Sequence, residues 1–199
     1  TGANVSVKLT DNFMQAAIEG KPYTQQYPID ATEPAFQKDI DASALWKKIV
    51  HNAWKSAEPG VLFWDTILKE SVPDCYADLG YRTVSTNPCG EIPLCPYDSC
   101  RLLAINLYSY VVNPFKPDAY FDFELFQKHV ALAQRIMDDI IDLELEKIER
   151  IIEKIDADPE SEDVRHTERV LWDKIYKKSG QGRRTGVGIT AEGDMLAAL

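Results

Sequence analysis

The sequence predicts an α/β fold, because segments with the two-residue period of strands alternate along the chain with segments that have the period of helices. Apolar and polar side chains alternate over residues 5–9, VSVKL, which is the pattern of a strand with one buried side. Apolar residues at helical spacing follow over residues 45–54, and residues 101–112, RLLAINLYSYVV, resemble a buried strand with its flanks. This order favours a parallel or mixed sheet over an all-helical bundle.

The first part of the chain divides into short elements. Thr10 and Asp11 can cap a helix that directly follows the first strand. Residues 21–34 hold three prolines and show little periodicity, which predicts a loop or a hairpin. The next helix should end at EPG, residues 58–60, and VLFWDTI, residues 61–67, is predicted to be a strand.

Residues 121–178 are predicted to be a helical segment. Its apolar residues follow one helical stripe as far as Ile155, with a kink or break expected along the way. The acidic run DADPESED at 156–163 interrupts the stripe before a second helix, predicted around ERVLWDKIYKK, residues 168–178, and ending at Ser179 and Gly180. The following GRRTGVGIT, residues 182–190, predicts a basic turn and a short strand, with Thr190 as the cap of a last helix.

Composition limits the classes of function. The chain has 199 residues, of which 45% are hydrophobic, enough for a substantial core. Its 32 acidic and 22 basic residues leave a formal net charge of -10, which would repel the phosphates of a nucleic acid polymer. No apolar run reaches the roughly 18 to 20 residues that cross a bilayer, and no signal peptide is evident at the start. We therefore expect a cytoplasmic protein with no membrane partner.

The two ends of the sequence predict a piece of a longer chain. Thr1 stands almost directly before the first predicted strand, and Leu199 closes a helix that has barely begun.

The four cysteines, Cys75, Cys89, Cys95 and Cys100, lie in one short window that has no helical period. Such clustering indicates chemistry or a metal rather than a secreted disulfide framework. Cys89, Cys95 and Cys100 could supply three thiolates to zinc, but neither the five-residue gap nor the four-residue gap between them is accompanied by a second close pair of the kind typical of zinc sites. A disulfide between Cys100 and another cysteine is a third option, and in the cytoplasm such a bond is typically transient and catalytic.

The stretch STNPCGE places an amide, a thiol and a carboxylic acid at alternate positions. In an extended segment Asn87, Cys89 and Glu91 would project to one side, with Pro88 and Gly90 facing the other way. A neighbouring carboxylate disfavours the thiolate anion, so the thiol is suited to react as S–H or as a neutral thiyl radical. The carboxylate can act as a general base and the amide can bind the same ligand, yet an ordinary turn has a similar composition.

Several stretches together resemble one protein family. STNPCGEIPLCPYDSCRLLAINL is similar to the active-site segment of ribonucleotide reductase catalytic chains, particularly the adenosylcobalamin-dependent class II enzymes. NVSVKLTDNFMQA, AWKSAEPGVLFWDTI and GRRTGVGITAEGDMLAAL resemble flanking segments of that family in the expected order. The resemblance covers essentially the whole chain.

The resemblance implies roles for the residues of this motif. Cys89 corresponds to the cysteine that becomes a thiyl radical and removes the 3′ hydrogen of a ribonucleotide. Glu91 corresponds to the general base on the 3′ hydroxyl, and Asn87 to the amide that holds the substrate hydroxyls. Pro88 and Gly90 complete the implied set of substrate-binding residues, and no metal ligand is expected.

Cys100 resembles one member of the redox-active cysteine pair that reduces the substrate and becomes a disulfide. The partner of that pair normally lies well upstream, which leaves Cys75 or a cysteine outside this sequence. Cys95 has no implied role.

The implied fold is a ten-stranded α/β barrel built from two five-stranded halves, with the radical cysteine on an inner finger loop. Residues 1–199 would form the central part of this catalytic barrel domain, and the finger-loop region would span about residues 83–101. Arg183 and Arg184 could contact phosphate, although a basic pair of this kind more often has a structural role.

The implied reaction is the reduction of ribonucleotides, as di- or triphosphates, to 2′-deoxyribonucleotides for DNA synthesis. Adenosylcobalamin is the implied cofactor, a dithiol such as thioredoxin the external reductant, and nucleotide effectors would bind outside this piece. The apolar stripe of the long helix could form a homodimer face as well as a core face. The isolated piece is expected to be inactive.

Two other interpretations remain open. One is a class I large chain that receives its radical from a metal-containing small subunit. The other is a non-catalytic zinc-binding or structural module that retains this segment.

Overall fold

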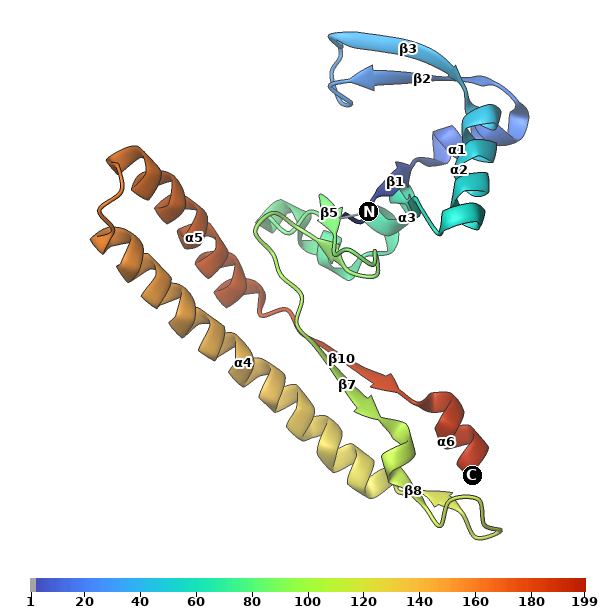
Figure 1. Cartoon of the computed structure of the whole chain (residues 1–199), viewed down its shortest axis with the longest axis vertical. Coiled ribbons are helices and arrows are strands. Elements are labelled where there is room, and N and C mark those ends of the chain that lie inside the picture. Colours follow the sequence, from blue (N-terminus) through green and yellow to red (C-terminus); the bar gives the residue numbers. More distant parts are fainter. Residues whose placement is uncertain (1–2) are drawn as a thin grey trace. The chain divides into compact units, whose positions relative to one another are not determined.

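The computed structural model describes residues 3–199 and has the mixed α/β character that the sequence predicts (Figure 1). It consists of two compact units, one ending at Pro96 and the other running from Tyr97 to Leu199. The boundary falls inside the predicted finger-loop region of residues 83–101. Cys89 therefore belongs to the first unit and Cys100 to the second.

The first unit is built on a pair of parallel strands. Strand β1 (Ser6–Leu9) pairs with β4 (Gly60–Phe63), and Lys8 lies opposite Leu62 in the register. Helices α1 (Asp11–Glu19) and α2 (Ala42–Ser56) lie between these strands in the sequence. The hydroxyl of Thr10 accepts a hydrogen bond from the backbone N–H of Phe13, so the predicted cap of the first helix is confirmed.

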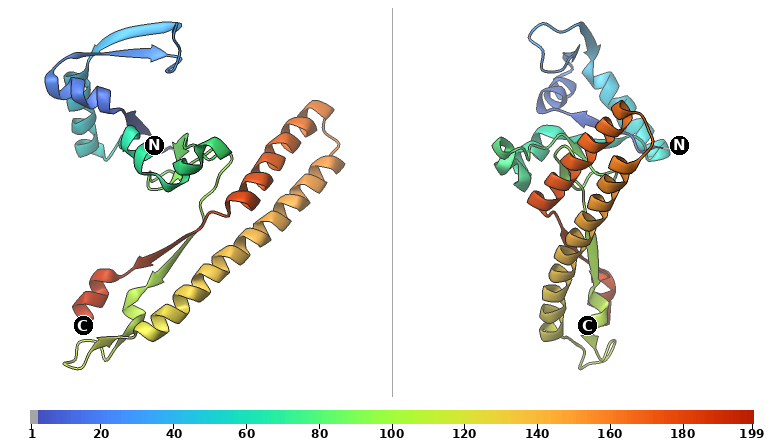
Figure 2. Two further views of the ribbon diagram at one scale, coloured as in Figure 1. Left: turned by 180° about the vertical axis from the view of Figure 1, so that it is seen from behind. Right: turned by 90° about the vertical axis from the view of Figure 1, so that its left-hand side faces the viewer.

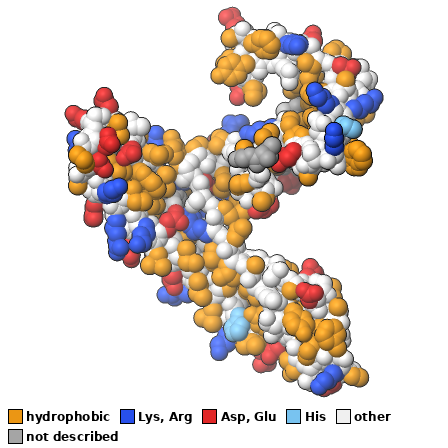
Figure 3. Space-filling model, in the orientation of Figure 1, with side chains coloured by type: hydrophobic (Ala, Val, Ile, Leu, Met, Phe, Trp, Pro, Cys, Tyr) orange, Lys and Arg blue, Asp and Glu red, His pale blue; other side chains and the backbone are white. Residues whose placement is uncertain are grey.

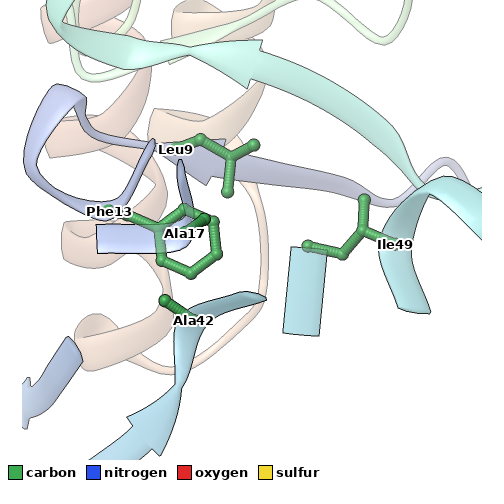
Figure 4. Close-up of a cluster of buried hydrophobic side chains, with 5 residues drawn as sticks. All are labelled: Leu9, Phe13, Ala17, Ala42 and Ile49. Carbon is green, nitrogen blue, oxygen red and sulfur yellow. The ribbon is translucent and has the colours of Figure 1, made fainter. Parts of the chain in front are cut away.

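A small apolar core joins the parallel strands to the two helices. Its buried members converge from β1, α1 and α2 (Figure 4); they are Leu9, Phe13, Ala17, Ala42 and Ile49. The alternation that predicts β1 explains this arrangement, because the side chains of Val7 and Leu9 point to the same face of the strand. Lys8 projects to the opposite face.

Residues 21–34 form part of a β-hairpin, as one of the two predictions for this segment states. Strand β2 (Pro22–Tyr27) pairs with β3 (Phe36–Asp41) in an antiparallel ladder. Asp41 ends the second strand and caps α2 by accepting a hydrogen bond from the N–H of Ala44.

The strand predicted over residues 61–67 is only partly correct. Strand β4 ends at Phe63, and α3 (Trp64–Glu70) begins at the next residue. The carboxylate of Asp65 in this helix accepts a hydrogen bond from the N–H of Asp11 at the start of α1. A tertiary contact thus favours a helical turn where composition alone indicates a strand.

The lack of helical period predicts that the cysteines lie on loops or short extended pieces, which holds for three of them, whereas Cys75 lies in a short 3₁₀ helix. The short elements that follow α3 are the 3₁₀ segment η1 (Val72–Leu79) and the two-residue strands β5 (Ser85–Thr86) and β6 (Pro93–Leu94). Strands β5 and β6 pair in an antiparallel hairpin that carries the STNPCGE motif.

The second unit contains another parallel pair and a long helical hairpin. Strand β7 (Leu102–Asn106) pairs in parallel with β10 (Gly186–Thr190). The buried strand predicted over residues 101–112 is interrupted, because the 3₁₀ turn η2 (Leu107–Tyr110) separates β7 from β8 (Val111–Val112). Strand β8 pairs with β9 (Tyr120–Phe121) immediately before the long helices.

Helix α4 (Phe123–Ala157) is continuous, so the kink or break expected within it is wrong. It runs side by side with α5 (Glu162–Gly182), which begins earlier than predicted, and the views agree on this pairing (Figure 2). The buried positions of α4 recur at helical spacing; they are Ala133, Met137, Ile141, Ile148 and Ile155. These residues support the interpretation of the stripe as a core face.

Part of the predicted stripe nevertheless stays exposed. Ile136 and Ile140 lie outside the buried face of α4, and hydrophobic side chains are interspersed with charged ones over the helical hairpin (Figure 3). The last helix, α6 (Glu192–Ala198), is not capped by Thr190 as predicted. Its N-cap is Ala191, which has a left-handed backbone and no side-chain cap.

The paired strands of residues 3–199 form five two-stranded sheets and no closed barrel. Two of these sheets are parallel, β1 with β4 and β7 with β10. Within the same residues, no helix combines the length and apolar character needed to span a bilayer, because charged residues recur throughout the long α4.

Candidate active site

The predicted site residues form a tight turn at the tip of the β5–β6 hairpin. Ser85 pairs with Leu94 across the hairpin, and the chain between the strands reverses over Asn87 to Gly90. The N–H of Gly90 donates to the carbonyl of Asn87 at 3.0 Å, which closes a four-residue turn. All five predicted substrate-binding residues, from Asn87 to Glu91, therefore lie on or beside one turn.

Side-chain hydrogen bonds fix the shape of this turn. The Nδ2 amide of Asn87 donates to Oε1 of Glu91 at 2.6 Å, and its Oδ1 accepts from the N–H of Ile92 at 3.0 Å. The premise of an extended segment is wrong, since Pro88 and Cys89 occupy the middle of a turn. Asn87 and Glu91 meet because the chain reverses between them. Cys89 lies between these two residues on the exposed tip.

Gly90 is required for two reasons. Its φ is +88°, a conformation that residues with a Cβ rarely adopt. An added Cβ would lie 3.0 Å from Cδ2 of Leu62 on β4, so a larger residue would press against the sheet. The glycine thus allows the turn to reverse and to approach the β1–β4 sheet closely.

The strand leading into the turn is held by η1. Thr83 is buried, and both its N–H and its hydroxyl donate to the carboxylate of Asp74, at 2.9 and 2.5 Å. Burial alone would raise the pKa of Asp74, but the hydrogen bonds from Thr83, together with the side chain of Ser71 and the charge of Arg82, outweigh it and the pKa is lowered. This contact anchors the hairpin two residues before β5 begins.

The cysteines differ in exposure. Cys75 and Cys89 are exposed thiols, Cys95 is buried, and Cys100 is half-buried just before β7. No group of three histidine, cysteine or acidic side chains that could hold a metal occurs in the part of the chain that the structure describes. The geometry therefore does not favour the zinc-module interpretation.

Arg101, next to Cys100, is the centre of a polar cluster that the motif analysis missed. The side chain of this residue is 7% exposed and forms a two-pronged ion pair with Glu144 of α4, with Nε at 2.6 Å from Oε2. The same guanidinium donates to the hydroxyl of Ser179 at 3.0 Å and to the carbonyl of Arg184 at 3.1 Å. Burial raises the pKa of Glu144, but the bonds from Arg101 outweigh it and the net shift is downward.

Arg183 and Arg184 are held by carboxylates, which supports their structural interpretation over phosphate binding. Arg183 donates to Asp138 and Asp142, each at 2.8 Å, and Arg184 donates to Asp98 at 2.6 Å. The hydrogen bond from Arg183 lowers the pKa of Asp138. Both guanidinium groups are thus committed to ion pairs inside the second unit.

Comparison with known proteins decides the family. Residues 2–199 match the family described as "Ribonucleotide reductase, barrel domain". The chain belongs to the ribonucleotide reductase family. In this family member, the matched residues include the turn with Asn87, Cys89 and Glu91 and the segment with Cys100.

Curated relatives agree with this family. A vitamin B12-dependent ribonucleoside-diphosphate reductase of Thermoplasma acidophilum is 36% identical over 161 residues, which is 76% of this chain and 19% of that protein. A protein of the same name from Mycobacterium tuberculosis is 32% identical over 197 residues, 98% of this chain and 23% of the relative. A vitamin B12-dependent ribonucleotide reductase of Streptomyces coelicolor is 32% identical over 139 residues, 68% of this chain and 13% of the relative. This reductase chain thus spans less than a quarter of the length of each of these relatives.

One of two features that the motif analysis missed has a signal in the sequence, and the other has none. The order Asn-Pro-x-Gly is typical of a turn, with proline second and glycine fourth, and indicates the reversal at residues 87–90. The pairing of Arg101 with Glu144 has no comparable signal, because 43 residues separate them.

Proposed function

We propose that this chain is the central part of the catalytic barrel domain of a class II ribonucleotide reductase. The intact enzyme would reduce ribonucleotides to 2′-deoxyribonucleotides by thiyl-radical chemistry. The observation that carries this proposal is the closed turn that joins Asn87 to Glu91 through a 2.6 Å hydrogen bond with an exposed Cys89 between them.

The groups of the turn suit complementary tasks on one ribose. Cys89, as a thiyl radical, would take the hydrogen atom from C3′ and become S–H, which leaves a carbon radical on the sugar. Glu91 would accept the proton of the 3′ hydroxyl, and the amide of Asn87 would bind the substrate hydroxyls. The bond between Asn87 and Glu91 holds the base in place before substrate arrives, which reduces the entropy cost of alignment.

The finger loop and the redox cysteine belong to the same proposal. The β5–β6 hairpin, within the region of about residues 83–101, would be the finger loop that enters the ten-stranded barrel, to which the two parallel strand pairs would contribute. Cys100 would supply one of the two thiols that reduce the substrate and are oxidised to a disulfide. Its partner would be Cys75 or a cysteine outside these residues.

Adenosylcobalamin is the proposed cofactor, because the relatives are named as vitamin B12-dependent. The exposed thiol of Cys89 fits such a group, since a radical donor must be able to approach the atom that it oxidises. When bound, the cofactor supplies the initiating radical by breakage of its cobalt–carbon bond. In this chain, the group that would react with the radical from the cofactor is the Cys89 thiol.

Further partners are proposed on the same basis. A dithiol such as thioredoxin would reduce the disulfide formed by Cys100, in the cytoplasm, where thiols are kept reduced. Nucleotide effectors would bind outside this chain, and a homodimer could use the exposed side of α4.

The test is turnover by the intact reductase that contains this chain. Activity is measured with ribonucleotide, adenosylcobalamin and a dithiol for wild type, Cys89→Ser and Glu91→Gln. Glutamine can still accept the hydrogen bond from Asn87, so Glu91→Gln removes the base while it keeps the turn. We expect loss of at least about a hundredfold in kcat for both variants with the fold intact. Activity retained by Cys89→Ser would overturn the proposal.

A further inference from the structure

The polar face of strand β1 lies against the base of the hairpin that carries Cys89. Val7 and Leu9 of this strand face the apolar core, so Lys8 projects from the other side of the sheet. The Nζ of Lys8 donates to the backbone carbonyl of Val84 at 2.7 Å. Val84 is the residue immediately before β5 and lies 76 residues from Lys8 in the sequence.

An aromatic ring holds the lysine in this position. The Nζ of Lys8 lies 3.5 Å from the centroid of the Trp64 ring, the first residue of α3. A cation over the face of tryptophan is attracted by the negative charge of the ring face. Although the Lys8 residue as a whole is exposed, burial around its ammonium group lowers its pKa.

The strand partner of Lys8 contacts the other end of the hairpin. Lys8 and Leu62 are opposite each other in the parallel register, and residues paired in this way project to the same face of the sheet. A Cβ on Gly90 would lie only 3.0 Å from Cδ2 of Leu62. Neighbouring side chains on one face of β1–β4 therefore meet both the entry and the tip of the hairpin.

We propose that Lys8, Leu62 and Trp64 form a seat that positions the turn carrying Cys89, with Lys8 as the principal positioning residue. Lys8 fixes the carbonyl of the residue that enters β5, and Leu62 limits how far the turn can approach the sheet. The seat acts through the backbone of the hairpin and does not touch the substrate. The effect of the seat on kcat rests on the proposed function. Its effect on the stability of the hairpin does not.

The mechanical consequence is tested by hydrogen exchange on the full chain. Lys8→Met keeps an apolar stem of similar length and removes the donor to Val84. We expect exchange of the amides in residues 83–94 to accelerate about tenfold, because the hydrogen bonds of Val84, Asn87, Gly90 and Ile92 open more often. Helices α1 and α2 should keep their protection. Arginine can also donate and stack on Trp64, so Lys8→Arg should restore most of the protection.

A matched control is Lys69→Met, because Lys69 is a highly exposed lysine that pairs only at the surface with Glu70. This variant should leave exchange in residues 83–94 unchanged. The proposed seat would be contradicted if Lys8→Met left exchange in residues 83–94 unchanged, or if it accelerated exchange equally throughout the first unit.

The catalytic consequence is tested on the intact reductase. Lys8→Met should lower kcat about tenfold with KM nearly unchanged, since misplacement of a reacting group by a fraction of an ångström reduces the rate without loss of binding contacts. Lys8→Arg should recover most of kcat. A kcat of Lys8→Met equal to wild type would overturn the positioning role. If Cys89→Ser also retained activity, the proposed function would fail, while the exchange experiment would still decide whether the seat exists.

Discussion

The segments around Cys89 and Cys100 are held in place by different forces. The turn with Cys89 is held by single hydrogen bonds, among them those from Asn87 to Glu91 and from Lys8 to the carbonyl of Val84. It also contains a glycine that approaches Leu62 closely. The segment with Cys100 continues into Arg101, whose guanidinium is paired with Glu144 away from most solvent. The difference teaches that the Cys89 turn keeps an exposed tip on a hairpin held by separate contacts, whereas the Cys100 segment is joined through one buried ion pair to two long helices.

The comparison predicts that losing the charge of Arg101 has the largest effect on stability. Arg101→Met leaves Glu144 without its ion-pair partner and removes the donors to Ser179 and the Arg184 carbonyl. We expect the free energy of unfolding of the second unit to fall by about 3 kcal/mol, below the full cost for a buried pair because Glu144 keeps some solvent contact. Urea unfolding followed by the circular dichroism of α4 and α5 measures this change.

The control for that experiment is an exposed pair on the same helix. Arg135→Met removes the partner of Asp139, where both side chains are largely in water. The expected change is at most about 0.5 kcal/mol. Similar losses for the two arginine variants would show that the cluster around Arg101 has no special role.

A smaller effect is expected at the turn with Cys89. Gly90→Ala must adopt a φ of +88° and place its Cβ against Leu62. We expect a cost of about 1 to 2 kcal/mol, concentrated in the hairpin. Hydrogen exchange of residues 83–94 would detect it, with Gly188→Ala as the control, because an added Cβ at Gly188 meets no atom within 4 Å. Equal exchange in the two alanine variants would contradict a close approach at Gly90.

The smallest expected effect is the loss of stability on protonation of Glu144, which is absent near neutral pH and grows as the pH falls. The folded pKa of Glu144 lies below its ordinary value, so its stabilising contribution is complete above the ordinary glutamate pKa. That contribution is lost as the pH falls through the depressed folded pKa of Glu144. Comparing wild type with Glu144→Gln in urea between pH 7 and pH 3 measures it.

The variant should show a flatter dependence of the unfolding free energy on pH. A slope equal to that of wild type would mean that Glu144 does not titrate differently in the folded and unfolded chain. Asp74 near the Cys89 turn also has a lowered pKa, so Asp74→Asn provides the same measurement for the first unit.

Much of the local structure follows from neighbouring residues. The alternation of residues 5–9, the cap at Thr10 and the apolar stripe that ends at Ile155 correctly predict β1, α1 and most of α4. The errors lie where a distant group intervenes or where local signals are weak. Residues 64–67, predicted to be part of a strand, are helical, and Asp65 there accepts a hydrogen bond from the distant N–H of Asp11. Thr190, predicted to cap α6, instead ends strand β10.

The sequence by itself determined the α/β character, the cluster of cysteines and the motif whose amide, thiol and carboxylate indicate the family. These properties depend on residue type and on spacings of a few positions, which the sequence displays directly. Only the tertiary structure decided that Asn87 and Glu91 meet across a turn, that Arg101 pairs with Glu144, and that Lys8 reaches the carbonyl of Val84. The physical reason is that such contacts depend on how the chain reverses and how strands align, and two of them join residues more than 40 positions apart.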